Sequence, residues 1–199
     1  MANTFLSQLR PAAAALVALT ILTGVVYPLL VTAVAQVAFS RQANGSLIVV
    51  AGDGRPKPIG SELIGQPFDD PAYFWTRPSA TTPAFNGAAS SGSNLGPTNP
   101  ALIEAVRARV AALKVGDPSD ARLVPVDLVT TSGSGLDPHI SPAAAEYQVA
   151  RVARARKVAP TLVEELVRKH IEPRQLGIFG ERRVNVLELN LELDAIAHR

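Results

Sequence analysis

The stretch AAAALVALTILTGVVYPLLVTAVAQVAF, residues 12–39, determines the architecture of the whole chain. Its 28 residues carry no formal charge, and Gln36 is the most polar of them. At about 1.5 Å per residue, a helix of this length measures roughly 42 Å, more than the ~30 Å hydrocarbon core of a bilayer. Arg10 and Arg41 stand on either side, where their charges can reach the lipid headgroups. The stretch therefore predicts a transmembrane helix.

A cleaved signal peptide is the alternative, because Ala33, Val34 and Ala35 form an A-x-A site after the apolar run. The apolar core of a signal peptide spans about 7 to 15 residues. More than 20 apolar residues precede the site here, so we predict an anchor that is retained. Either interpretation places the rest of the chain outside the cytoplasm.

Every fourth residue along one side of this stretch is small or conformationally restricted, at Thr20, Gly24 and Pro28. Such a stripe lets a second transmembrane helix approach closely. Small residues are also common in membrane helices generally, so a packing face and a chance spacing both stay open. Pro28 predicts a kink. The positive charges on the two flanks do not fix the orientation.

Charge is concentrated in the remainder of the chain, where the first acidic residue is Asp53. The 19 Lys and Arg against 17 Asp and Glu give a net charge of +2, too balanced for a nucleic-acid partner. The absence of cysteine excludes disulfides and thiol nucleophiles, and the three scattered histidines predict no metal site. We predict a short N-terminal tail over residues 1–11, a transmembrane helix over 12–39 and one soluble α+β domain over 40–199.

Short strands are expected in the soluble domain where β-branched residues run between turn residues. They cover residues 46–50, residues 59–68 after the turn AGDGRPKP, and residues 123–130, where Pro125 favours an edge strand. Residues 73–75, Tyr-Phe-Trp, predict either a core strand or an exposed docking anchor. Residues 85–100 are a long Asn-, Gly-, Ser- and Pro-rich loop.

About four helices are expected, each beginning at a capping residue that precedes an apolar stripe. The first follows Asn99 and ends at Gly116, and the third carries a capping box of Thr161 and Glu164. The last segment alternates leucines as a strand would, but its Asn cap and its helical spacing favour a helix from Val186. The helix that follows Ser141 is predicted to place three arginines on its outer face: Arg151, Arg154 and Arg156.

The sequence lacks the motifs of nucleotide-binding loops and of serine or zinc hydrolases. One segment, SGSGLDPH at residues 132–139, places Ser, Asp and His close together. Catalytic triads draw their residues from separate elements, so a turn that leads into the next helix is the simpler interpretation. A nest of backbone amides that binds an anion is a further possibility.

Nine motifs, in order from Leu9 to Asp194, resemble the C-subunit family of the Kdp potassium-transporting P-type ATPases. Two departures are small: Phe85 stands where the family usually has tyrosine, and Ser91 replaces a glycine. The matching motifs are LRPA, TGVVYPLL, QANGSLI, GSELIGQPF, YFWTRPSAT, SSGSNLGPTNP, VPVDLVTTSGSGLD, RVARAR and VNVLELNLELD.

The resemblance implies a single-pass subunit of a four-protein complex in the cell inner membrane, with its N-terminus cytoplasmic and its soluble domain periplasmic. The implied partners are a channel-like potassium-translocating subunit, a P-type ATP-hydrolysing subunit and a small single-span subunit. The implied role is that of a non-catalytic accessory subunit, needed for assembly, which acts as a catalytic chaperone by raising the ATP affinity of the hydrolysing subunit.

The resemblance also implies functional residues. Gln148 matches a glutamine proposed to contact nucleotide, so that ATP would be met only in a transient complex with the hydrolysing subunit and no cofactor would be bound firmly. Arg77, Ser93 and Asn94 are candidates for a partner interface. From its own sequence context, Gln148 is more simply a helix residue that hydrogen-bonds its surroundings, and an effect on ATP affinity can act through packed membrane elements.

Two other function classes stay open at this point. A membrane-anchored periplasmic enzyme would use Asp137, His139 and a serine of the 132–139 segment. A ligand-binding module would use the same segment to hold a small molecule without reaction.

Overall fold

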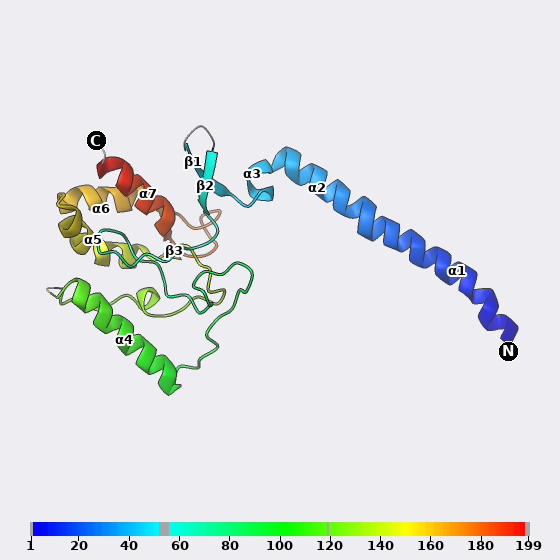
Figure 1. Cartoon of the computed structure of the whole chain (residues 1–199), viewed down its shortest axis with the longest axis horizontal. Coiled ribbons are helices and arrows are strands. Elements are labelled where there is room, and N and C mark those ends of the chain that lie inside the picture. The colour runs from blue at the N-terminus through cyan, green and yellow to red at the C-terminus, as the bar shows by residue number, and fades with distance from the viewer. Residues whose placement is uncertain (1, 52–55, 119, 198–199) are drawn as a thin grey trace. The chain divides into compact units, whose positions relative to one another are not determined.

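The computed structural model describes residues 2–51, 56–118 and 120–197. The chain divides into two compact units, one ending at Leu47 and the other beginning at Ile48. Figure 1 shows the long helical segment that precedes the second unit and the helices and short strands of that unit, here called the body. The predicted α+β class with one long N-terminal apolar helix is confirmed.

The N-terminal unit is almost entirely helical. Helix α1 spans Ala2–Ile21, a π-helical turn follows at Leu22–Val26, and α2 spans Tyr27–Ala38. The helix thus begins well before the apolar stretch predicted over residues 12–39. A single turn, α3 (Ser40–Ala43), ends the unit.

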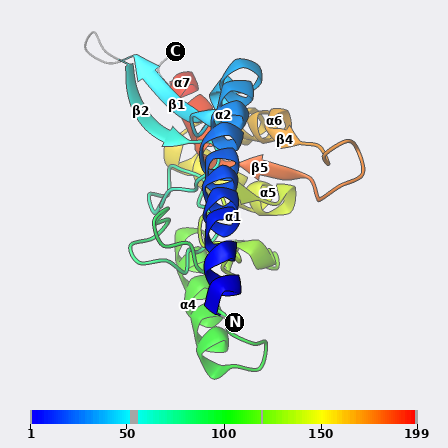
Figure 2. The same cartoon turned by 90° about the vertical axis from the view of Figure 1, so that its right-hand side faces the viewer.

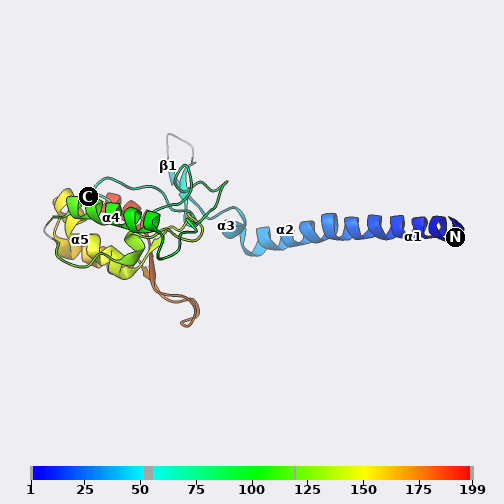
Figure 3. The same ribbon diagram turned by 90° about the horizontal axis from the view of Figure 1, so that it is seen from below.

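The π-helical turn lies directly before Pro28, where the sequence predicts a kink. Proline has no N–H to donate, and the turn adapts by a wider hydrogen bond in which the Tyr27 N–H donates to Leu22 O. The Thr23 hydroxyl donates to Leu19 O at 2.7 Å. The ribbon continues from α1 into α2 without a sharp bend (Figures 1 and 3), so the irregularity is absorbed locally.

Two small sheets occur in the described chain. Strands β1 (Leu47–Ala51) and β2 (Pro56–Ser61) form the first. Residues 52–55 of the turn predicted there lie outside the described residues. The second has the order β3–β5–β4, with β3 at His139–Ile140, β4 at Ile171–Glu172 and β5 at Arg183–Asn185. Both pairings are antiparallel, with Ile140 and Ile171 opposite Val184 on either side.

The strand predicted over residues 123–130 is wrong. The segment contains instead a short 3-10 helix, Val126–Leu128, because Pro125 cannot donate to a ladder and Asp127 turns inward to bind Ser141. The strand predicted over 59–68 is right only at its start, since β2 ends at Ser61.

Four helices of the body agree with the sequence: α4 (Pro100–Gly116), α5 (Pro142–Arg156), α6 (Pro160–Lys169) and α7 (Val186–Ala197). Three caps are confirmed, since the side-chain oxygens of Asn99, Ser141 and Asn185 accept amide hydrogens of the first turns. The prediction of a capping box at the start of α6 is wrong. That helix begins at Pro160 after Ala159, without a side-chain cap, so Thr161 already lies inside its first turn.

The core of the body lies between α5, α6, α7 and the three-stranded sheet. Figure 2 shows these three helices with strands β4 and β5. Helix α4 packs against one edge of this core, with Leu113 buried and Val106 and Val110 in contact with the core residues. This agrees with the apolar stripe predicted for that helix. Phe74 from the Tyr-Phe-Trp segment is fully buried, although the segment forms no strand. The remaining fully buried apolar side chains include Ala144, Val152, Val163, Val184, Val186 and Leu189.

Candidate functional site

Two side-chain amides hold the Tyr73–Trp75 segment where a neighbouring strand would otherwise do so. Gln148 of α5 accepts from Trp75 N at 2.7 Å and donates to Trp75 O at 3.1 Å. Asn190 of α7 accepts from Phe74 N at 2.9 Å and donates to Phe74 O at 3.0 Å. Both amides are 1 % exposed. Two successive residues therefore obtain their backbone hydrogen bonds from helix side chains.

Two arginines of α5 complete this clasp, which we define as Gln148, Asn190, Arg151 and Arg156 around residues 73–75. The Arg151 guanidinium stacks over the Trp75 ring at 4.2 Å and donates to Pro71 O at 2.6 Å. Arg156 stacks over the Tyr73 ring at 4.6 Å and donates to Ala72 O at 2.7 Å.

The prediction that these arginines lie on an outer face is wrong for Arg151, which is 4 % exposed, and for Arg156, whose side chain is 10 % exposed. The 70–75 segment covers that face of α5. Burial lowers the pKa of Arg151 to about 10, and the charges of Asp117 and Asp70 only partly oppose this shift.

Gln148 uses its full hydrogen-bonding capacity within the chain. Besides its two bonds to Trp75, its oxygen accepts from Arg151 Nη2 at 2.6 Å and its nitrogen donates to Ala144 O at 3.2 Å. The geometry of Gln148 is therefore that of a helix residue that hydrogen-bonds its surroundings, which is one of the two predictions made from the sequence. Contact with nucleotide stays a prediction, and it requires the amide to leave these partners.

Arg77 belongs to a second cluster, which faces the 132–139 segment. It forms an ion pair with Asp137 at 3.1 Å and donates to Thr131 O at 3.2 Å. His139 lies 3.3 Å from Asp137 through Nδ1 and 3.8 Å from Glu172 through Nε2. Burial of Asp137 opposes its ionisation, but hydrogen bonds from the side chain and backbone of His139 and the charge of Arg77 outweigh that effect and lower its pKa.

The serines of the 132–139 segment stabilise their own turn. Ser132 Oγ accepts from Gly135 N at 2.9 Å, and Ser134 Oγ accepts from Leu136 N at 3.1 Å. Among the described contacts, no serine hydroxyl of this turn meets His139, so the three residue types do not form a triad here. Two successive amides that an anion-binding nest could use, those of Gly135 and Leu136, are already bonded to these serines.

The turn packs backbone against backbone on the loop SSGSN, far away in sequence. Ser91 N donates to Ser134 O at 3.0 Å. Gly135 has φ +68°, and a Cβ there would lie 2.6 Å from Ser91 O, while a Cβ on Gly92 would lie 2.9 Å from Gly133 O. Glycine is therefore required at both positions. We call these two contacting segments, residues 90–92 and 132–136, the glycine platform.

The three residues proposed for a partner interface do not come together through direct bonds. Ser93 and Asn94 are exposed directly after the glycine platform, and Asn94 has φ +53°. Arg77 is half-buried. In the described part of the chain, no hydrogen bond or ion pair joins Arg77 to either of the other two.

The family model of K+-transporting ATPase, c chain (KdpC), matches residues 9–195. The chain belongs to the KdpC family. The resemblance predicted from the nine motifs is thereby confirmed, and with it the coarse function of a subunit of a potassium-transporting ATPase.

Relatives in the KdpC family match almost from end to end, and each is described as a Potassium-transporting ATPase KdpC subunit. The chain is 60 % identical over 192 residues to that of Methylococcus capsulatus, covering 96 % of this chain and 99 % of the relative. It is 64 % identical over 190 residues to that of Sorangium cellulosum, covering 95 % and 98 %. The subunit of Herpetosiphon aurantiacus is 62 % identical over 188 residues, covering 94 % and 95 %.

This KdpC-family chain has one helix that is long and apolar enough to cross a membrane among the described residues. It covers Ser7–Ala38 with a mean hydropathy of 2.3, and none of its most apolar window is buried. The stripe residues Thr20, Gly24 and Pro28 are all exposed. A Cβ added to Gly24 would meet no atom of the described chain within 4 Å, so nothing inside this chain requires glycine there.

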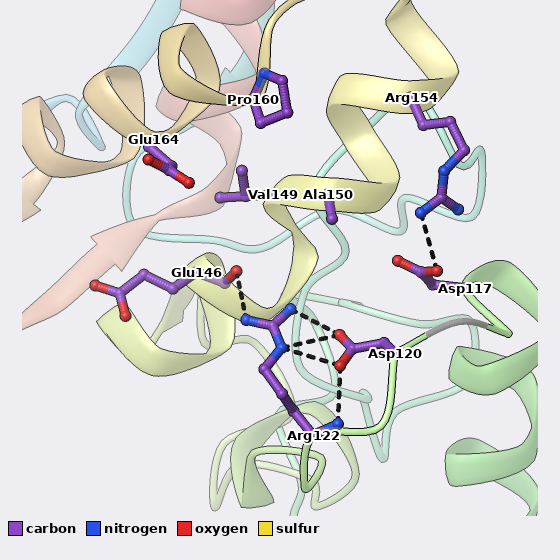
Figure 4. Close-up of a pocket in the computed structure, with 9 residues that line it drawn as sticks. All are labelled: Asp117, Asp120, Arg122, Glu146, Val149, Ala150, Arg154, Pro160 and Glu164. Atoms are coloured by element: carbon purple, nitrogen blue, oxygen red, sulfur yellow. Dashed lines mark hydrogen bonds and ion pairs between the residues drawn. The ribbon is translucent and has the colours of Figure 1, made fainter.

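A polar hollow of about 310 Å³ is lined by α5, the start of α6 and the side chains of Asp117, Asp120 and Arg122 (Figure 4). Arg122 pairs with Asp120 at 2.6 Å and Arg154 pairs with Asp117 at 3.0 Å. In the described part of this KdpC-family chain both lining arginines are therefore neutralised, which makes the hollow a poor binding site for phosphate.

Sequence reasoning missed Asn190, Arg151 and Arg156 as members of the clasp. Asn190 carries a usable signal, because it is a polar residue among the leucines of an apolar helix and a buried amide needs partners. The sequence gives no such signal for the two arginines, because the segment that covers them lies some eighty positions earlier in the chain.

Proposed function

We propose that this chain is a non-catalytic accessory subunit that assembles with the other chains of a potassium-transporting ATPase and raises the ATP affinity of the hydrolysing subunit. The partners proposed are a channel-like potassium-translocating subunit, the ATP-hydrolysing subunit and a small single-span subunit. The chain is anchored in the inner membrane with its N-terminus in the cytoplasm and its body in the periplasm.

One observation carries the proposal: the amide of Gln148 and the serine hydroxyls of the 132–139 turn, which could otherwise bind a ligand or take part in a reaction, are bonded to the body's own backbone. Gln148 has no free donor or acceptor, and the serines of the 132–139 turn are bonded to its amides. Meanwhile the apolar helix Ser7–Ala38 leaves its surface uncovered. These features favour a protein that acts by packing against neighbours.

An effect on ATP affinity is then a coupling free energy between two sites, and such coupling is reciprocal. If the chain raises the affinity of the ATPase for ATP by some factor, ATP must raise the affinity of the ATPase for the chain by the same factor. The test measures the ATP dissociation constant with and without the full chain, and the dissociation constant of the chain with and without a non-hydrolysable ATP analogue. Two equal factors above one support the proposal, and an unchanged ATP affinity contradicts it.

Direct contact between Gln148 and ATP is the finer form of the same function. It is tested with a membrane-impermeant photoreactive ATP analogue applied to either side of sealed vesicles that contain the whole complex. Label on the chain near Gln148 supports direct contact. Label confined to the hydrolysing subunit, together with a changed ATP affinity, supports coupling at a distance. Protease accessibility in spheroplasts tests the orientation, since a periplasmic body is cleaved without lysis.

A further inference from the structure

The connection between β4 and β5 projects from the body as an arm, as Figures 2 and 3 show from two directions. Its end carries three large apolar side chains: Leu176 is 88 %, Ile178 73 % and Phe179 61 % exposed. No charged residue lies between Gln175 and Gly180. We call Leu176, Ile178 and Phe179 the apolar tip. Exposed apolar groups gathered in this way mark interaction surfaces, unlike single exposed hydrophobic residues.

The arm is held in a defined shape by its own bonds. Gln175 and Phe179 exchange two backbone hydrogen bonds of 2.9 Å, and Arg174 binds both carboxylate oxygens of Glu181 at 2.7 and 2.6 Å. Leu176 has φ +52°, a conformation that bulky residues rarely adopt, and it precedes Gly177 at φ +75°. Strained residues of this kind are concentrated at functional sites. These hydrogen bonds therefore hold the turn that carries the apolar tip in one conformation.

The charges around the arm favour a protein partner over a lipid surface. Arg174 is paired with Glu181, and Arg183 with Glu172 at 2.8 Å. Membrane-binding tips combine apolar residues with arginines or lysines that remain free for anionic headgroups. Here two of the three arginines of residues 172–183 are neutralised within the chain. A compact neutral anchor with an aromatic ring fits an apolar pocket on another protein.

We propose that the apolar tip inserts into a neutral, apolar pocket on a neighbouring subunit of the ATPase complex. The inference rests on the proposed function, because it takes the partner to be another chain of the same assembly. Gly177 and Gly180 on the turn have no atom within 4 Å of an added Cβ, so the described chain leaves space around the tip for that partner.

The absence of cysteine in this chain allows a direct test. Phe179→Cys places a single thiol on the apolar tip, and a maleimide carrying a photoreactive group is attached to it on the full chain before that chain is assembled with the other subunits in a membrane. The matched control is Leu123→Cys, at a site that is 94 % exposed and outside the arm. We expect a covalent adduct between the chain and one other subunit from Phe179→Cys and none from Leu123→Cys.

Each other outcome is also decisive. An intact complex in which Phe179→Cys labels only lipid overturns the proposal in favour of a membrane contact, and an adduct between two copies of this chain overturns it in favour of self-association. If the complex is intact and no adduct forms, the proposal for the apolar tip is overturned, whereas the proposed function is not affected. If the unaltered chain does not co-purify with the other subunits, the proposed function fails and the tip proposal fails with it.

A second variant measures how much the contact contributes. Phe179→Asp places a charge on the apolar tip without touching the core of the body, so the melting temperature of the full chain should not change. We expect the affinity for the partner subunits to fall by more than about tenfold, as is usual for an anchor residue, and the co-purified partner subunits to decrease. Leu123→Asp should co-purify as the unaltered chain does. Equal retention by both variants overturns the proposal.

Discussion

The amide of Gln148 makes both backbone hydrogen bonds of Trp75, a residue 73 positions earlier in the chain. A helix side chain thus takes the place of a neighbouring strand. Asn190 does the same for Phe74, so the aromatic segment enters the core from the side of the helices. This arrangement explains how an extended segment is buried although it belongs to no sheet.

Gln148→Met should destabilise the body, because methionine fills a similar volume but makes no hydrogen bonds. The change leaves the N–H and C=O of Trp75 and one donor of Arg151 without their partner, at about 1–3 kcal/mol for each buried group left unpaired. A melting temperature lower by at least about 6 °C is expected, at roughly 2–4 °C per kcal/mol for a domain of this size.

The control is Gln175→Met at an exposed position, which should melt like the unaltered chain. Thermal unfolding of the full chain in detergent provides the measurement. An unchanged melting temperature for Gln148→Met, combined with a weaker ATP affinity of the complex, would contradict the structural role and favour the nucleotide contact.

The depressed pKa of Asp137 makes the stability of the body depend on pH. A carboxyl whose pKa is lower in the folded than in the unfolded state stabilises the fold above its ordinary value of 3.8, and this contribution is lost as the pH falls through the folded-state pKa. Asp137→Asn should therefore lower the melting temperature at pH 7 and reduce the further loss between pH 4 and pH 2.

Part of the acid sensitivity should survive in that variant. Asp120 and Glu192 also have lowered pKa values, chiefly because they accept hydrogen bonds from Arg122 and Lys169. Glu104→Gln, at an exposed site on α4, serves as the control and should follow the profile of the unaltered chain. Parallel pH profiles for Asp137→Asn and the unaltered chain would refute the assignment.

Gly135→Ala should disrupt the glycine platform. Its Cβ would lie 2.6 Å from Ser91 O, and the backbone at φ +68° disfavours any side chain. We expect a loss of more than about 1 kcal/mol in the free energy of unfolding. Gly133→Ala in the same turn has no atom within 4 Å of the new Cβ and should be nearly neutral. Urea unfolding of both variants decides the matter, and equal stabilities would show that the two segments are not packed as described.

Gly24→Leu tests whether the transmembrane stripe is a packing face. Leucine favours the helix and the lipid, so the anchor itself should form normally, whereas a close approach by a second helix would be blocked. We expect a reduced yield of the other subunits in co-purification. Val25→Leu, one residue further along the same helix, is the matched control. Full retention of the complex by Gly24→Leu would argue against the stripe.

The parts of the fold that local chemistry determines were predictable from the sequence. The positions at which α4, α5 and α7 begin follow from an Asn or Ser side chain that accepts an amide hydrogen two or three residues later in the chain. The apolar helix follows from composition alone. The π-helical turn before Pro28 was not predictable, because the sequence indicates that a hydrogen bond is lost but not how the helix adapts.

Two of the failures share a cause, which is a partner outside the local sequence. The run at residues 123–130 has the composition of a strand, yet Asp127 is drawn to Ser141. Helical periodicity places Arg151 on an outer face, and only the segment from Pro71 to Trp75 turns that face into an interior. Gln148 was singled out through the family resemblance, while nothing local shows that all four of its hydrogen bonds are internal.

The bond between Asn190 and Phe74 joins positions 116 residues apart, and this separation has a consequence during biosynthesis. Chains are made from the N-terminus at about 5–20 residues per second. The apolar helix therefore leaves the ribosome long before the partner of Phe74 has been translated. For that interval the Tyr73–Trp75 aromatics have no interior to enter, and a nascent chain truncated ahead of Asn190 would be a target for chaperones and proteases.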